Sequence, residues 1–183
     1  MAFSIETRSK TSAMPGQNFT KTKALYTPAQ RLKRDSSPWT LVQGVLAPIQ
    51  FVVFLVSLGL VLRYLIAGEG QYEAIVSVVV KTFTLYAIMV TGCIWEKVVF
   101  DCYLFAPAFY WEDVFSMLVL GLHTAYLAAL LTDTLAAQQL MYLALAAYAA
   151  YVVNAAQFIW KLRMARLDHA RQTAGISLKG AAA

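Results

Sequence analysis

The sequence predicts an all-α integral membrane protein: a bundle of four transmembrane helices with both termini in the cytoplasm. Hydrophobic residues make up 60% of the 183 residues and charged residues only 14%, whereas a soluble domain is about 25% charged. Four long apolar segments alternate with short polar connections. Of the fifteen lysines and arginines, seven precede Pro38 and five follow Trp160, and this bias places both ends on the cytoplasmic side.

One membrane domain is predicted between two flexible tails. Residues 1–24 are rich in Ser, Thr and Lys and have too few apolar side chains to pack, which is typical of a flexible cytoplasmic tail. Residues 25–167 form the four-helix transmembrane domain with a short interfacial helix at its start, and residues 168–183 form a second flexible tail. Topology and anionic lipid explain the basic ends, so we expect the bilayer as a partner and no nucleic acid.

Two helix starts are marked in the sequence before the first span. Thr27, Pro28 and Gln30 have the spacing of a capping box with proline at the first helical position. Ser37 and Pro38 repeat the cap, and an interfacial tryptophan follows them. The first start predicts a short basic helix at the membrane surface, and the second predicts the beginning of the first span.

We expect the spans at residues 39–66, 74–99, 112–131 and 138–160. At about 1.5 Å per residue, segments of this length cross a hydrocarbon layer of about 30 Å.

Polar residues mark one face of each of the first two spans. In the first span they recur every seven residues, on one slowly drifting face: Gln43, Gln50, Ser57 and Tyr64. In the second span a polar face is formed by Lys81, Thr84, Thr91 and Trp95. We expect the Lys81 side chain to extend outward and reach the membrane surface.

The connection between the second and third spans is more acidic than expected for a cytoplasmic connection. It should be cytoplasmic, yet Lys97 is its only basic residue, against Asp101, Glu112 and Asp113. Ionisable groups among so many apolar side chains are costly to bury unless they are paired or used. Residues 94–126 are therefore the first candidate for function.

Several polar residues of different spans are predicted to lie at one depth. Counted at about 1.5 Å per residue, Gln50, Tyr151, Asn154 and His123 lie roughly 10–16 Å from the cytoplasmic ends of their helices. Glu112 and His123 are eleven residues apart and share one helix face. These positions predict a pocket that opens to the cytoplasm, with carboxylates at its mouth and His123 at its floor.

Each of these residues also has a purely structural interpretation. The aromatic residues of the connection either line the pocket or form an interfacial belt: Phe105, Phe109 and Trp111. His123, Gln50 and Asn154 either contact a ligand or hydrogen-bond between helices. Glu112 and Asp113 also suit the first turn of a helix, where acidic residues interact favourably with the dipole.

No cofactor motif is present in the sequence. Glu112 and His123 are too far apart to be two ligands of one metal ion, and no Glu-x-x-His motif, glycine-rich phosphate loop or Ser-His-Asp arrangement occurs. Cys93 and Cys102 both fall on the predicted cytoplasmic side, so we expect free thiols. We therefore expect no redox cofactor and no metal bound by the protein itself.

Two motifs carry a resemblance to a known family. The chain contains IWEKVVF at residues 94–100 and YLFAPAFYWEDVFSML at residues 103–118. With the flanking blocks, residues 25–167 resemble the 2-vinyl bacteriochlorophyllide hydratases of bacteriochlorophyll biosynthesis, also described as chlorophyllide 3-vinyl hydratases. The Asp101-Cys102 pair is unusual for that family, which argues against an essential role for Asp101.

The resemblance implies a hydro-lyase that adds water to the 3-vinyl group of a chlorophyllide-type tetrapyrrole and gives a 3-(1-hydroxyethyl) group. It also implies a bacterial inner or intracytoplasmic photosynthetic membrane and neighbouring pigment-biosynthesis enzymes as possible partners. The substrate carries its own magnesium, for which His123 is a possible ligand, and Lys97 is a candidate partner for the substrate propionate.

The reaction requires an acid and a base. We expect Glu96 to be the acid and Glu112 or Asp113 to be the base, because an apolar setting keeps one carboxyl protonated while a second stays ionised. A pigment carrier or assembly factor without enzymatic activity is the alternative. An ion-pathway subunit using Lys81, His123 and Glu96 is a third interpretation, which needs a polar line through the outer half of the bundle.

Overall fold

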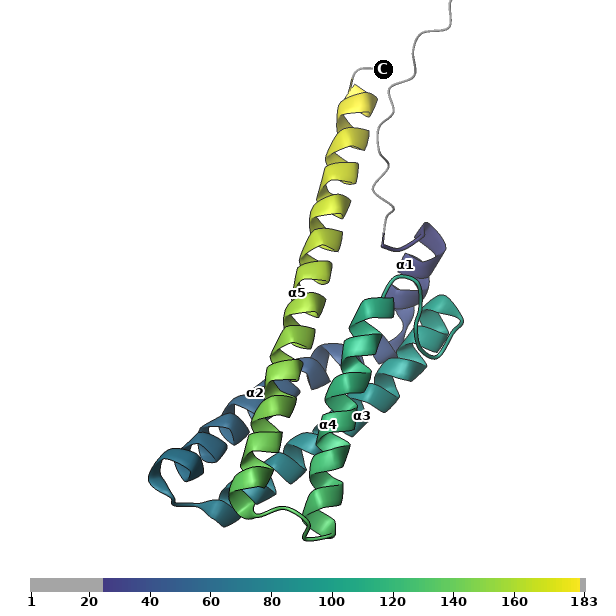
Figure 1. Ribbon diagram of the computed structural model, residues 1–183. Helices are drawn as coiled ribbons and strands as arrows, with labels where there is room; N and C mark the ends of the chain where they lie inside the picture. Colours follow the sequence, from purple (N-terminus) through teal and green to yellow (C-terminus); the bar gives the residue numbers. More distant parts are fainter. Residues whose placement is uncertain (1–24, 182–183) are drawn as a thin grey trace, which may run out of the picture.

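The computed structural model describes residues 25–181, and this part of the chain is entirely helical, without strands (Figure 1). The helices, in chain order, are α1 (Pro28–Ser36), α2 (Pro38–Ala67), α3 (Gln71–Phe100), α4 (Tyr110–Leu131) and α5 (Ala137–Ala181). The predicted 1–24 tail lies outside the described residues, and α5 continues as a helix well beyond residue 168.

Four of these helices are long and apolar enough to cross a membrane: α2, α3, α4 and the Ala137–Leu167 part of α5. Large apolar side chains cover their outer surface, for example Leu41, Val56 and Phe83, which are 72%, 58% and 60% exposed. Such a surface suits lipid, and backbone hydrogen bonds closed within each helix satisfy the polar groups there. The prediction of an all-α, four-span membrane protein is confirmed; the orientation of its termini stays a prediction.

The two predicted helix starts are confirmed. Gln30 N–H donates to Thr27 Oγ1 at 3.3 Å, and the Gln30 side chain accepts from Thr27 N–H at 2.9 Å, which completes the capping box. At the start of α2, Ser37 Oγ accepts from the N–H of Trp39 at 3.3 Å. Helix α2 ends at Gly68, whose left-handed φ of 73° suits glycine.

The polar faces of α2 and α3 form the seam between these two antiparallel helices. Gln43 Nε2 donates to Thr91 Oγ1 at 2.7 Å, and the hydroxyls of Ser57 and Ser77 are 2.7 Å apart. Lipid tails are as apolar as the side chains of the helices, so the hydrophobic effect does not drive membrane helices together. Interhelical hydrogen bonds of this kind help to hold them in contact. The seven-residue repeat of the first span therefore marks its contact with the second.

The structure contradicts the prediction that Lys81 reaches the membrane surface. Its side chain does not extend outward: the residue is fully buried, and Nζ lies 3.8 Å from the centre of the Tyr151 ring. Lys81 sits near the middle of α3, too far from either membrane surface for its side chain to reach water, and the seam offers polar partners instead. Around this level, the core of the bundle includes Phe54, Tyr126 and Tyr148.

The bundle consists of two hairpins, α2–α3 and α4–α5, which cross each other (Figure 1). At the end nearest α1, helices α2 and α5 diverge, and the α3–α4 connection and α1 lie at this end (Figure 1). Helix α1 packs against α3 there. The crossing of the hairpins therefore separates α2 from α5 at the end where α1 lies.

Candidate active site

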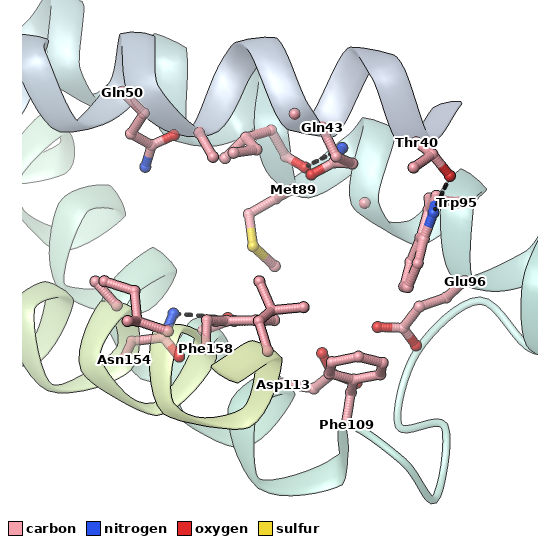
Figure 2. A pocket seen from close by; sticks show the side chains of 18 of the residues that line it. Thr40, Gln43, Gln50, Met89, Trp95, Glu96, Phe109, Asp113, Asn154 and Phe158 are labelled. Carbon is pink, nitrogen blue, oxygen red and sulfur yellow. Dashed lines mark hydrogen bonds between the residues drawn. The ribbon is translucent and has the colours of Figure 1, made fainter. Parts of the chain in front are cut away.

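A cavity of about 910 Å³ occupies the open end of the bundle, with walls from α1, α2, α3, α4 and α5. Its middle is mostly apolar, with polar groups at defined positions, as Figure 2 shows for Met89, Gln43 and Asn154. Small-molecule sites commonly measure about 300–1,000 Å³ and combine apolar walls with a few polar groups. The cavity is therefore of a size and character that suit one large, flat, apolar ligand.

Aromatic rings pack around the mouth of the cavity. The Tyr26 ring stacks on Phe100 at 5.8 Å between centroids, the Phe109 ring stacks on Phe158 at 6.0 Å, and Trp95 meets Phe109 edge-on at 5.7 Å. Burial raises the pKa of Tyr26 above its ordinary value, so its hydroxyl stays neutral near pH 7. These rings form a rim that connects the segment before α1, the end of α3, the start of α4 and α5.

Glu96 and Asp113 face each other across this rim, the first from α3 and the second from α4 (Figure 2). Both line the cavity and are nearly buried, at 6% and 4% exposure. Each carboxyl group lies close enough to influence the other electrostatically. Because two ionised carboxylates repel each other in an apolar setting, the pair is suited to hold one proton.

The α3–α4 connection supplies backbone donors to the two carboxyls. Phe105 N–H donates to Asp113 Oδ2 at 2.8 Å, and Ala106 N–H reaches Glu96 Oε2 at a weaker 3.5 Å. Phe105 adopts a left-handed φ of 59° to do this, an unfavourable conformation for a bulky residue. The shorter bond goes to Asp113, so the connection stabilises an ionised Asp113 more than an ionised Glu96.

Glu112 lies outside the cavity. Its Oε2 accepts from Lys161 Nζ at 2.5 Å, and the same ammonium group lies 4.9 Å from the centre of the Phe109 ring. Adjacent residues of a helix point about 100° apart, so one of Glu112 and Asp113 faces α5 while the other faces the cavity. Of the two candidate bases, the structure brings only Asp113 to Glu96.

His123 also lies outside the cavity. It is fully buried beside the Tyr148 ring, 5.9 Å away between centroids, and its Nδ1 bonds the carbonyl oxygen of Val119 at 2.8 Å. Its Nε2 has no partner among the described residues. Glu112 and His123 lie eleven residues apart, close to three helical turns, but neither of them lines the cavity.

The remaining predicted site residues divide between the cavity and the outer surface. Four line the cavity: Gln50, Phe109, Tyr151 and Asn154. Three do not: Lys97, Phe105 and Trp111. Lys97 Nζ is bonded to the carbonyl oxygen of Asp101 at 2.8 Å, and Trp111 is 67% exposed, as an interfacial belt residue would be.

Several cavity residues were not among the predicted site residues, namely Tyr26, Met89, Gly92, Trp95 and Phe158. Trp95 carried a signal, because it shares the polar face of the second span, and its Nε1 donates to Thr40 Oγ1 at 2.9 Å. The others are ordinary apolar residues whose inward direction depends on how the hairpins cross. Within the described residues no group of His, Cys, Asp or Glu is arranged to hold a metal ion, and Cys93 and Cys102 are free thiols.

The fold and this site define a class: a multi-pass membrane protein with a large, mostly apolar cavity and a buried pair of carboxyl groups at its rim. Comparison with known proteins identifies the family within that class. The family model described as 2-vinyl bacteriochlorophyllide hydratase matches residues 26–164, and the chain belongs to this family.

Two relatives from photosynthetic bacteria are similar over most of their length. The 2-vinyl bacteriochlorophyllide hydratase of Cereibacter sphaeroides is 66% identical over 146 residues, which cover 80% of this chain and 91% of the relative. The protein of the same name from Rhodobacter capsulatus is 62% identical over 153 residues, covering 84% of this chain and 89% of the relative. No solved structure matches the chain.

Proposed function

We propose that this protein adds water to the vinyl group of a bacteriochlorophyllide-type macrocycle held in the cavity, and so acts as a hydro-lyase of bacteriochlorophyll biosynthesis. The observation that carries the proposal is the Glu96–Asp113 pair, two buried carboxyl groups that face each other at the edge of a cavity of about 910 Å³. The names of the two relatives supply the substrate class.

The reaction begins with proton transfer to the vinyl group. Glu96, which holds the shared proton, donates it to the terminal vinyl carbon, and the electron pair of the double bond forms the new C–H bond. The positive charge appears on the carbon next to the ring, where conjugation with the macrocycle spreads it. An ionised carboxylate beside this cation stabilises it electrostatically in the apolar cavity.

Water then attacks the carbon next to the ring. Its oxygen forms the new C–O bond while Asp113, the ionised partner, accepts one of its protons. That proton then passes from Asp113 to the neighbouring Glu96 carboxyl group, which restores the starting state. The balance is one water added and one double bond lost, with no electrons transferred, so the reaction needs no redox cofactor.

The aromatic walls of the cavity also suit the proposed substrate. The rings of Phe109 and Phe158 present flat apolar surface next to the carboxyl pair, where the vinyl edge of a macrocycle would lie. The magnesium ion belongs to the substrate in this proposal, and the protein binds none of its own.

We place the protein in the bacterial inner or intracytoplasmic photosynthetic membrane, where neighbouring enzymes of pigment synthesis would exchange substrate and product with it.

The decisive experiment measures addition of water directly. Membranes containing the protein are incubated with a vinyl chlorophyllide in isotope-labelled water, and the pigment is analysed by mass spectrometry. We expect the mass to increase by one labelled water, and we expect no increase with Glu96→Gln. Binding of pigment by the wild-type protein without any gain of mass would refute the hydratase and favour a pigment carrier.

A further inference from the structure

The floor of the cavity is polar, although it lies deep in the membrane. Gln50 and Tyr151 form it, from α2 and α5, and Lys81 of α3 lies directly behind both. With its amide oriented to satisfy its neighbours, Gln50 accepts from Lys81 Nζ at 2.9 Å and donates to the carbonyl oxygen of Thr84 at 3.2 Å. The floor is thus built around a lysine at membrane depth.

Lys81 has no carboxylate partner within the described residues. Its contacts are the oxygen of Gln50 and the face of the Tyr151 ring, 3.8 Å away. An ionisable residue inside a membrane bundle is expensive and commonly serves function. A cation also acts over several ångströms in an apolar interior, so Lys81 makes the cavity floor attractive for an electron-rich atom.

Tyr151 carries the one group of the floor that is free to bind. Its hydroxyl makes no hydrogen bond with any other residue that the structure describes, yet Tyr151 lines the cavity. The two other tyrosines at this depth differ from it. The hydroxyl of Tyr148 is bonded to Ser57 at 2.5 Å, and the buried hydroxyl of Tyr126 lies outside the cavity.

The distance from the floor to the carboxyl pair follows from the helices. Asp113 and Ser116 are three residues apart in α4, Ser116 is bonded to Asn154 of α5 at 2.9 Å, and Asn154 is three residues from Tyr151. Six residues of helical rise place Tyr151 about 9 Å deeper than Asp113. This depth matches the breadth of a tetrapyrrole ring, so one macrocycle can contact both ends.

We infer that Tyr151 is a specificity-determining residue whose hydroxyl donates a hydrogen bond to a carbonyl oxygen on the edge of the macrocycle opposite the vinyl group. Lys81 is a positioning residue that holds the Tyr151 ring and strengthens its hydroxyl as a donor. Chlorophyllide-type macrocycles carry keto and ester carbonyls on that edge. With the carbonyl edge at the floor, the vinyl group meets Glu96 and Asp113. This inference rests on the proposed function for the identity of the ligand.

The test is the carbonyl stretching band of the bound pigment in resonance Raman spectra. We expect the band to move to higher frequency in Tyr151→Phe, because the ring and its contact with Lys81 remain while the hydrogen bond is lost. A smaller shift in the same direction is expected in Lys81→Met. Tyr148→Phe is the matched control, since it removes a hydroxyl that does not face the cavity, and its band should stay at the wild-type position.

A binding measurement supports the spectrum. A vinyl macrocycle that lacks the carbonyl should bind the wild-type protein about fivefold more weakly, the effect of one hydrogen bond, and Tyr151→Phe should bind both pigments equally. An unmoved band in Tyr151→Phe, or an equal shift in Tyr148→Phe, overturns the inference. Because the pigment needs only to bind, these results are separate from the mass measurement, whose failure would overturn the hydratase instead.

Discussion

Exchanging Asp113 for asparagine should stop hydration, whereas exchanging its neighbour Glu112 for glutamine should not. The two residues are adjacent and acidic, so the sequence gives no reason to treat them differently. In the structure Asp113 contacts Glu96 at the cavity, and Glu112 is held by Lys161 outside it. The comparison therefore tests the rotation of α4 and the assignment of the base together.

The substitution at position 113 should lower the reaction rate, whereas the substitution at position 112 should mainly lower stability. An asparagine at position 113 still accepts the N–H of Phe105, which is 2.8 Å from Asp113 Oδ2, so the fold should persist while the base is lost. A positioned acid or base contributes about 10²- to 10⁴-fold to a rate, and we expect a loss in that range. Glutamine at position 112 keeps an acceptor for Lys161 but loses the charge. This should cost about 1–2 kcal/mol of stability with only a few-fold change in turnover.

The assay is single-turnover hydration by purified protein in detergent, with the absorption spectrum of bound pigment as the check on binding. Both variants should bind pigment, and only Glu112→Gln should convert it. If Glu112→Gln is inactive and stable while Asp113→Asn still turns over, α4 faces the cavity through the other residue and the proposed base is wrong.

Three further changes test the loop, the cavity and the seam between α2 and α3. Phe105→Gly should remain active, because glycine adopts the φ of 59° without strain, whereas Phe105→Pro removes the N–H donor, cannot adopt this positive φ, and should lose most turnover; equal activity would exclude a role for the conformation and donor of this backbone segment. Gly92→Phe should prevent pigment binding measured by absorption, while Gly92→Ala should not, because its methyl group meets only the Gln43 amide at 3.9 Å; binding by both would place the pigment elsewhere. Thr40→Val leaves the Trp95 indole without its acceptor and should lower the free energy of unfolding by about 1–2 kcal/mol. Denaturation in detergent measures this, with Thr40→Ser as the control; equal stability of the two variants would contradict the prediction.

The spans and the seam could be predicted because their signals are local or periodic. Apolar length identified four helices, and the caps at Thr27 and Ser37 were placed to the residue. The seven-residue repeat that includes Gln43 and Ser57 identified the face of α2 that meets α3. Each of these inferences depends on neighbours along one helix, and tertiary packing did not change them.

The site was predicted less completely because it depends on helix rotation and on the crossing of the hairpins. Counting residues predicted a common depth for Gln50, Tyr151 and Asn154, and all three line the cavity. Depth does not determine the direction of a side chain, so His123 was expected at the floor although it is buried in the core beside Tyr148. Lys81 was expected to point outward for a related reason, since its polar partners come from two other helices.

The α3–α4 connection gives the site an asymmetry that two facing helices alone would not have. Hydration needs one carboxyl protonated and one ionised, and Glu96 and Asp113 are similarly buried. The connection distinguishes them by giving its short hydrogen bond, from Phe105 N–H, to Asp113. Because this donor is a backbone group, the difference depends on the conformation of the connection and not on the Phe105 ring, which is 42% exposed. Under the proposed mechanism, the left-handed φ of Phe105 would hold its N–H against Asp113 and so keep the base ionised beside the acid.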